Sequence, residues 1–421
     1  MQIVIYTFEV TNRLNYVLDF IFVQYFGLDY YLETDIVIFK KKTSITNFLC
    51  INYSNEYFND CINIYSENLL FEKDIHTQKI FISKIETLPI LFPSDKLDIS
   101  FPFDIFAAIF YLISRYEEYL PHEQDEHGRY CSHNSILSNP IFNFSPIVEQ
   151  WLDFFKLELL KKQPLLIFKK HQFSKLFTFD IDNAFQYKHR NWLKHPPNIF
   201  KSEVRNVLFG KQKDKYNTFD EIFQFCNQLS HKPYFFYLLN DSGKRNSNVS
   251  PNAFALFQII NNCKDYNIGI HSSYHFSETI LENEIKLLSK IVNNRVINAR
   301  QHFLKISFPD YFRILSNQTI TKDFSLGYPN ISGCRAGTTQ AFLFFDIIND
   351  RQTTLWIHPF VFMDATYQYY IHDDSTTIQQ KVEKLLDEIQ SINGNFVSLF
   401  HNDLLLDNLS FKKILKFIEQ Y

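Results

Sequence analysis

The sequence predicts an α/β protein in which residues 171–421 form a domain built on a parallel sheet or barrel. A smaller α+β domain is expected at residues 1–170. From about residue 173 onward, short apolar runs alternate with longer segments of helical periodicity, which is the pattern of strand–helix units with parallel strands. With 421 residues, 46% of them hydrophobic, the chain is long enough to bury two cores.

The N-terminal domain is predicted to combine short strands with one clear amphipathic helix. Gln2–Thr7 and Asp35–Phe39 have the apolar composition of strands. Pro102 and Asp104 suit a helix start, and a broad apolar face follows over 105–113. The charged and polar residues from Arg115 to Arg129 are expected to form a salt-bridged structural corner. The alternative is that the N-terminal domain selects substrate, covers a cleft or recruits a partner.

In the C-terminal domain the predicted elements alternate along the chain. The expected strands are Lys175–Phe179, Pro233–Leu239, a short strand into Ile270, Val296–Arg300, Leu355–Ile357 and Phe396–Phe400. The expected helices are Phe219–Leu229, Asn252–Cys263, Glu278–Val292, Thr376–Ile392 and Phe411–Tyr421. Because side chains at the carboxyl ends of parallel strands carry the chemistry in such folds, polar residues just after each strand are the site candidates.

Composition excludes several classes of protein. The net charge of −4 is small and the charges are mixed, so no basic stripe predicts nucleic-acid binding. Only nine glycines argue against a glycine-rich phosphate loop. The 46 Phe and 24 Tyr indicate a compositional bias, with extra aromatic packing or sugar-stacking faces as the alternative.

The expected location is the cytoplasm. The six cysteines form no C-x-x-C pair and are expected to be reduced. The N-terminus lacks the basic and long apolar regions of a secretory signal. The most apolar windows, such as Tyr16–Phe26 and Ile105–Ile113, are too short to span a bilayer.

Two strand ends carry possible metal ligands. Asp180 and Asp182 follow the first strand and share one face of an extended chain, where their charges repel unless a cation or proton lies between them. A D-x-D pair can also simply end a strand or cap a helix. His271 and His275 follow a later strand, and on a helix this spacing points both imidazoles to one side. Paired surface histidines are a common alternative.

Further polar residues follow the later strand-like runs: Arg335, Thr338, Asp364 and His401. His401, at the end of the last strand, is a candidate general acid or base, or only a capping side chain. Taken singly, each has a structural explanation. Together, these strand-end sites indicate a metal hydrolase.

These residues resemble the motifs of the polysaccharide deacetylases, carbohydrate esterase family 4. Thr178–Asp182, His271–His275, Arg335–Thr338 and Leu399–His401 stand in the order of that family, over roughly residues 173–421. The resemblance implies a distorted, incomplete (β/α) barrel. The N-terminal part, at Ser114–Glu118 and His127–Arg129, looks like a module of no assigned activity that precedes such deacetylases in some chains.

The resemblance also implies a ligand set and a base. One divalent metal ion would be held by Asp182, His271 and His275, with zinc as the default and iron, cobalt or nickel also fitting. Asp180 would be the general base, and Arg335 would pair with it.

The remaining roles implied by the resemblance concern the leaving group and the oxyanion. His401 would protonate the leaving amine while Asp364 pairs with it, and the N–H of Thr338 would stabilise the oxyanion. The family's Asp-Trp pattern is absent, so Asp346 rivals Asp364. Arg300 and His302 follow another strand; they either reach the substrate or, as we expect, anchor a loop.

The implied activity is hydrolysis of an N-acetyl group on an amino-sugar-containing glycan or glycan precursor, releasing acetate. One alternative is a non-catalytic carbohydrate-binding or assembly protein that keeps the fold. Retention of Asp180 and His401 argues against it, because a structural metal needs neither. Another alternative is an amidase acting on a small substrate that is not a polymer.

Overall fold

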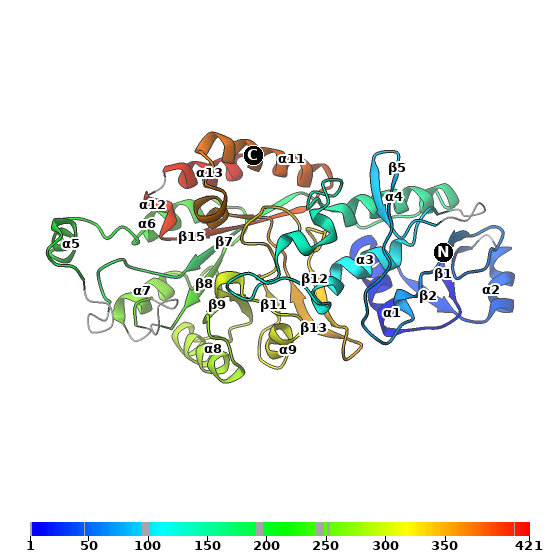
Figure 1. Ribbon diagram of the computed structural model, residues 1–421, viewed down its shortest axis with the longest axis horizontal. Coiled ribbons are helices and arrows are strands. Elements are labelled where there is room, and N and C mark those ends of the chain that lie inside the picture. Colours follow the sequence, from blue (N-terminus) through cyan, green and yellow to red (C-terminus); the bar gives the residue numbers. More distant parts are fainter. Residues whose placement is uncertain are drawn as a thin grey trace.

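The structure is a computed structural model that describes residues 2–45, 47–94, 101–190, 197–240, 248–250, 253–407 and 409–421. Figure 1 shows an elongated molecule, with the N-terminal sheet at one end and the large C-terminal sheet beyond it. Within the described part of the chain, no helix combines the length and apolar character needed to cross a bilayer.

The N-terminal part is built around a four-stranded sheet of order β2-β1-β3-β4, and all its neighbouring strands run parallel. A separate antiparallel hairpin pairs β5 with β6. The elements of this part are β1 (Gln2–Thr7), α1 (Asn12–Leu18), η1 (Asp19–Phe26), β2 (Tyr30–Glu33), α2 (Ile36–Thr43), β3 (Phe48–Tyr53), β4 (Ile62–Ile64), η2 (Asn68–Leu70), β5 (Ile82–Ile85), β6 (Leu88–Leu91), α3 (Ile105–Ile113), η3 (Tyr116–Tyr119), η4 (Ser132–Asn134), η5 (Ile136–Ser138) and α4 (Ile147–Lys162).

The prediction of a strand at Asp35–Phe39 is wrong, because α2 begins there. The Asp35 carboxylate caps this helix by accepting hydrogen bonds from the N–H groups of Val37 and Ile38. Lysines in the last turn suit its C-terminal end. These end effects outweigh the strand preference of the β-branched run that suggested the prediction.

The C-terminal part is built on a nine-stranded sheet of order β12-β13-β11-β10-β9-β8-β7-β15-β14. Its neighbours run parallel except β12 and β13. The edge strands β12 and β14 do not pair with each other among the described residues, so the barrel is incomplete, as predicted. The strands are β7 (Ser174–Ile181), β8 (Tyr234–Leu238), β9 (Asn267–Ser272), β10 (Asn298–Gln301), β11 (Lys322–Asp323), β12 (Phe342–Asp346), β13 (Arg351–Ile357), β14 (Phe362–Met363) and β15 (Asn395–His401).

The helices between these strands confirm the predicted alternation, including Glu278–Val292 to the residue. The predicted start of another helix at Asn252 lies outside the described residues. The helical elements of this part are α5 (Ser202–Leu208), α6 (Phe219–Cys226), α7 (Phe254–Asn262), α8 (Glu278–Val292), η6 (His302–Leu304), α9 (Asp310–Ser316), α10 (Asp364–Thr366), η7 (Tyr367–Ile371), α11 (Ser375–Ser391), α12 (Leu404–Asp407) and α13 (Leu409–Gln420).

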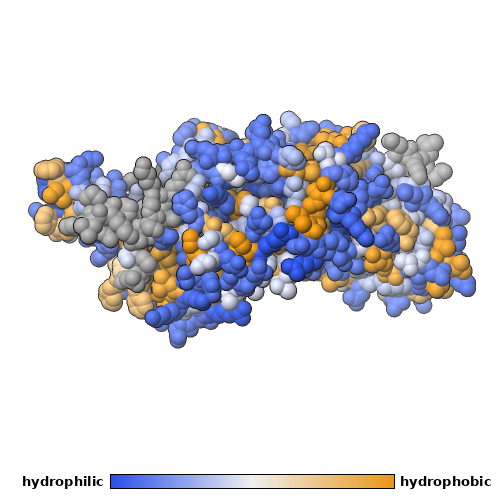
Figure 2. All heavy atoms as spheres, turned by 60° about the horizontal axis from the view of Figure 1, so that its bottom comes forward, coloured by the Kyte–Doolittle hydropathy of each residue, from blue (hydrophilic) through white to orange (hydrophobic). Residues whose placement is uncertain are grey.

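Apolar side chains join the two parts into one continuous core. Every residue of α3 is buried, and the ring of Tyr16 on α1 packs 4.9 Å from that of Phe345 on β12. The two sheets lie on either side of the predicted boundary between residues 170 and 171, but this shared core means that the division into two domains stays a prediction. Aromatic residues supply much of the core, although apolar surface also gathers at the tip that carries α5 (Figure 2), where Phe200 and Phe209 are exposed.

A buried ion network also links the two parts. Arg335, which precedes β12, donates to both carboxylate oxygens of Glu118 at 3.0 and 2.6 Å. Arg115 donates to the same carboxylate at 2.9 Å. All three side chains are almost completely buried, so removing one charge leaves another uncompensated in a medium of low dielectric constant.

We therefore expect Arg335→Met to lower the free energy of unfolding by about 3–5 kcal/mol in urea denaturation. Lys381→Met breaks an ion pair with Asp373 in which the lysine is 49% exposed, and it should cost under about 1 kcal/mol. Equal losses for the two variants would contradict a structural role of the buried network.

Candidate active site

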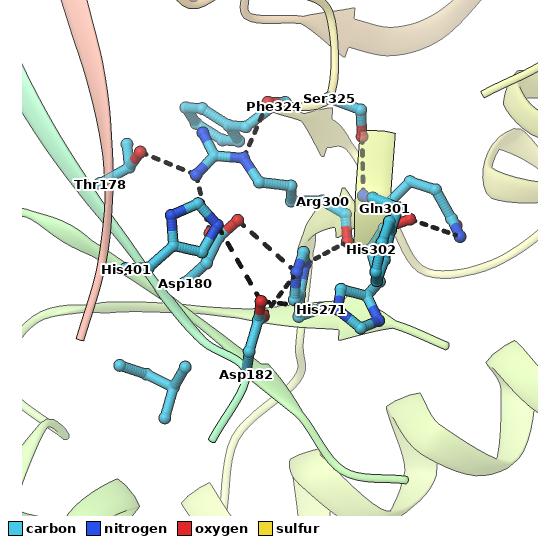
Figure 3. A network of polar contacts seen from close by, with 12 residues as sticks. Thr178, Asp180, Asp182, His271, Arg300, Gln301, His302, Phe324, Ser325 and His401 are labelled. Carbon is cyan, nitrogen blue, oxygen red and sulfur yellow. Dashed lines mark hydrogen bonds and ion pairs between the residues drawn. The ribbon is translucent and has the colours of Figure 1, made fainter. Parts of the chain in front are cut away.

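The register of four parallel strands brings the candidate residues to one edge of the sheet. Asp180 on β7 lies level with His401 on β15, and His271 on β9 lies level with Arg300 on β10. Because the strands are parallel, Asp182 and His302 extend from the same edge just beyond their strands. Figure 3 shows these side chains converging from β7, β9, β10 and β15.

Asp182, His271 and His302 form a cluster whose potential ligand atoms all lie within 4.8 Å of one another. Nε2 of His271 lies 3.1 Å from one carboxylate oxygen of Asp182, and Nε2 of His302 lies 3.5 Å from the other. All three side chains face one another in Figure 3. Two imidazoles and one carboxylate form a facial ligand set that suits a divalent transition metal.

The surroundings of His271 and Asp182 fit such an ion. The Nδ1 atom of His271 lies 3.0 Å from the carbonyl oxygen of Arg300, a contact that places the proton on Nδ1 and leaves the Nε2 lone pair facing Asp182. Oδ1 of Asp182 is buried and accepts no well-directed hydrogen bond among the described residues, although Nε2 of His271 lies 3.1 Å away. A buried carboxylate oxygen of this kind needs a partner, and a cation would supply one.

Burial and the neighbouring charges shift the pKa values of the three cluster residues in different directions. Burial tends to raise the pKa of Asp182, but the charges of His302 and His271 lower it well below its usual value. Burial lowers the pKa of His302, which favours the neutral imidazole that binds metals. Burial also opposes protonation of His271, yet the charges of Asp180 and Asp182 raise its pKa in the metal-free protein. A bound cation would replace that proton.

His275 does not join this cluster. The helical condition for a shared site of His271 and His275 is not met, because β9 ends at Ser272 and α8 begins only at Glu278. Without a helical turn, the i, i+4 spacing no longer brings the two imidazoles to one side. The His275 side chain is exposed, and His302 takes the third position. The expectation that Arg300 and His302 only anchor a loop is also wrong.

Asp180 pairs with Arg300. Nη1 of Arg300 donates to Oδ1 of Asp180 and to the hydroxyl of Thr178, both at 2.8 Å, and Nε donates to the carbonyl of Phe324 at 2.9 Å. The guanidinium is fully buried. The prediction that Arg335 pairs with Asp180 is therefore wrong, since Arg335 is engaged by Glu118 on the other side of the core.

The predicted partnership of Asp364 and His401 is confirmed. Nδ1 of His401 lies 2.6 Å from Oδ1 of Asp364, whose other oxygen accepts from the backbone N–H of His401 at 2.7 Å. The rival Asp346 instead binds Arg313 through both its oxygens. Burial alone would lower the pKa of His401, but the charge and hydrogen bond of Asp364, with Asp182 and Asp180 nearby, raise it to about 10.

Thr338 lies away from these residues. Its hydroxyl accepts from the N–H of Gln340, and the neighbouring Thr339 donates to Glu149 of α4 through both N–H and hydroxyl. The segment thus packs against the N-terminal part. It does not line the site cavity, so the structure gives no support to an oxyanion role for Thr338.

The cluster faces a cavity of about 130 Å³. Residues that the sequence analysis did not assign to a site also line it, among them Arg129, Phe303, Tyr369, Tyr370 and Asp403. Burial and the charge of Asp182 raise the pKa of Asp403 to about 7 in the metal-free protein. Asp403 follows β15 directly after His401 and Asn402, so its strand-end position was the available signal.

Comparison with protein families gives one match, to a family of unknown function (DUF7033), over residues 3–164. No curated protein matches the chain.

Several solved structures are similar to this one. A Mycobacterium smegmatis protein assigned as a polysaccharide deacetylase is 14% identical, with a TM-score of 0.40 over 60% of this chain and 84% of that chain. The Puue allantoinase is 9% identical, with a TM-score of 0.40 over 59% and 84% of the two chains. A polysaccharide deacetylase from Bacillus cereus is 12% identical, with a TM-score of 0.30 over 59% and 88%. At such low identity, the chemistry of this site is argued from its own residues.

The ligand set can be tested by zinc affinity, measured by competition with a chromophoric chelator. We expect His302→Ala to weaken binding by more than about 100-fold, because it removes a donor atom and not only a supporting contact. His275→Ala, at an exposed position, should leave the affinity unchanged. The reverse pattern would restore His275 to the ligand set.

Proposed function

We propose that this chain is a metal-dependent amidohydrolase that removes the N-acetyl group from an amino-sugar-containing glycan or glycan precursor. The observation that carries the proposal is the convergence of three groups on one cavity. These are the ligand set Asp182–His271–His302, the Asp180–Arg300 pair and the His401–Asp364 pair. A non-catalytic carbohydrate-binding protein would need the first group only. The motif order that resembles the polysaccharide deacetylases agrees with this proposal.

Asp182, His271 and His302 would hold the divalent ion, with zinc as the default. Such an ion supplies Lewis acidity toward an amide carbonyl and increases the acidity of water. The protein's own contribution is to fix the donors. The carbonyl of Arg300 orients the His271 ring, and the same residue's guanidinium orients Asp180.

Asp180 is placed to act as the general base. One carboxylate oxygen is occupied by Arg300, while the other lies 3.6 Å from Nε2 of His271, on the side of the ligand set. The free oxygen can accept a proton from a water that attacks the carbonyl carbon of the substrate. The guanidinium compensates the charge of Asp180 and holds the carboxylate in one orientation, which avoids reorganisation during the reaction.

His401 is placed to act as the general acid. Asp364 holds Nδ1, so Nε2 points toward the cavity, 4.0 Å from a carboxylate oxygen of Asp182. When the carbon–nitrogen bond of the amide breaks, the proton on Nε2 passes to the departing nitrogen. The products are acetate and a free amine, and His401 is left neutral.

The cavity favours a short substrate. Its volume of about 130 Å³ is small beside the roughly 300–1,000 Å³ of typical ligand pockets. Tyr369 and Tyr370 among its lining residues offer aromatic faces for a sugar ring. A glycan precursor therefore fits better than the interior of a long polymer. The alternative activity, hydrolysis of a small amide that is not a sugar, is tested with the substrate panel described next.

The base assignment predicts that Asp180→Asn lowers the rate of acetate release by about 10²- to 10⁴-fold. The panel should contain an N-acetylated monosaccharide, a nucleotide sugar, an oligosaccharide and a simple N-acetyl amide. Asp373→Asn, which changes a surface carboxylate in the same way, serves as the control. Full activity of Asp180→Asn would remove Asp180 from the base role, and activity on the simple amide alone would favour the amidase alternative.

The acid assignment predicts a shift in the pH profile. His401 works in its protonated form, so the rate falls as pH rises through its pKa. In the metal-free protein that pKa is raised to about 10, despite burial, chiefly by Asp364, and a bound cation lowers it by repulsion. Asp364→Asn removes the stabilising charge, so the alkaline limb of kcat/KM should move to lower pH. An unchanged alkaline limb would show that His401 is not the acid.

A further inference from the structure

A tight turn of the N-terminal part, residues 125–129, reaches the candidate active site. Oδ1 of Asp125 accepts hydrogen bonds from the N–H groups of His127 and Arg129 at 2.9 and 3.0 Å. Oδ2 accepts from Nε of Arg129 at 2.6 Å. Gly128 has a φ of 74°, a conformation that glycine adopts without strain. Hydrogen bonds within the turn thus hold Arg129 in place, in addition to its contacts with other segments.

Two side chains of this turn contact the loops that carry site residues. Nη1 of Arg129 donates to the carbonyl of Phe303 at 2.9 Å, and Nη2 donates to the hydroxyl of Tyr370 at 2.9 Å. Nδ1 of His127 lies 3.2 Å from the hydroxyl of Tyr274, and its ring packs 5.1 Å from the ring of Phe303. The turn therefore contacts three loops that are far apart in the sequence.

Each of those three segments follows a residue of the site along the chain. Tyr274 follows His271 by three positions, and Phe303 directly follows His302. Tyr370 lies in η7, which follows α10 and its first residue, Asp364. The turn thus contacts the loops of both imidazole donors and of the His401 partner.

The backbone after His302 needs such support. Phe303 and Leu304 both have left-handed conformations, with φ values of 60° and 52°. For residues other than glycine each such conformation costs about 1–3 kcal/mol and persists only where its surroundings hold it. Arg129 is 4% exposed, and its hydrogen bond fixes the peptide group between Phe303 and Leu304, one residue beyond His302.

We propose that the turn at residues 125–129 contributes to the active site: Arg129 is a positioning residue for His302, and its side chain lines the substrate cavity. This inference rests on the ligand set of the proposed function. It gives a role to the region that matches a family of unknown function. It also replaces the expectation that the charged residues from Arg115 to Arg129 form only a structural corner.

The experiment compares wild type, Arg129→Ala, Arg129→Lys and Tyr370→Phe as full-length chains. Zinc affinity is measured by chelator competition, and hydrogen–deuterium exchange is measured on the metal-free proteins. Arg205→Ala is a surface control: its guanidinium also binds backbone carbonyls, those of Ile199 and Phe200, but the residue is exposed and lies outside the cavity.

We expect Arg129→Ala to weaken zinc binding by about 10- to 100-fold, as loss of a supporting contact does. Exchange should accelerate at residues 302–306 and not in the N-terminal sheet. Tyr370→Phe, which removes one hydroxyl, should shift both readouts in the same direction by less, and Arg129→Lys should recover only part of the loss. Arg205→Ala should change neither.

Wild-type zinc affinity together with wild-type exchange in Arg129→Ala would overturn the inference while leaving the proposed function intact. If wild type itself binds no zinc, the proposed ligand set fails, and the exchange data still decide whether the turn orders the loop after His302. If Arg129→Ala does not fold, the comparison of Tyr370→Phe with wild type decides in the same way.

Discussion

Asp180 and Asp182 stand two positions apart at the end of one buried strand. Each carboxylate needs positive charge beside it to offset the repulsion between them. Asp180 receives it from Arg300, at 2.8 Å, and Asp182 faces the imidazoles of His271 and His302. Much of the site depends on this arrangement. Because Arg300 also accepts from His271 through its carbonyl, a single residue of β10 orients the base and one metal donor together.

The N-terminal part completes this arrangement from outside the barrel. It supplies Glu118, which engages Arg335, and Arg129, which binds the carbonyl of Phe303, the residue after His302. Both contacts are made by buried charged groups, so each carries a desolvation cost that only well-placed partners offset. The continuous apolar core between the two sheets provides the rigid support that such partners need. The site therefore depends on the whole chain and not on the barrel alone.

Much of the C-terminal fold could be predicted from the sequence, because strand–helix alternation is a local pattern. Asp180, Asp182, His271 and His401 could be found for the same reason: each follows an apolar strand, and parallel strands meet at one edge. The pairing of His401 with Asp364 was expected only from the resemblance to the polysaccharide deacetylases, and the structure shows the contact. The α2 segment shows the limit of local patterns, because a helix capped by the carboxylate of Asp35 stands where a strand was expected.

The missed residues depend on contacts that a single sequence does not show. His275 has the right spacing for a helix, but the backbone there is not helical, and the donor comes from the next strand, 31 positions after His271. Arg335 was expected near Asp180, yet a carboxylate 217 positions away engages it. Partner choice of this kind is decided by the packing of the two parts, which local periodicity does not encode.

The central claim is that one divalent ion binds among Asp182, His271 and His302. Anomalous X-ray diffraction at the zinc absorption edge, from crystals grown with stoichiometric zinc, tests it most directly. We expect one strong peak within bonding distance, about 2.0–2.2 Å, of a carboxylate oxygen of Asp182 and of Nε2 of both histidines. A peak at His275, or none between these three side chains, would contradict it.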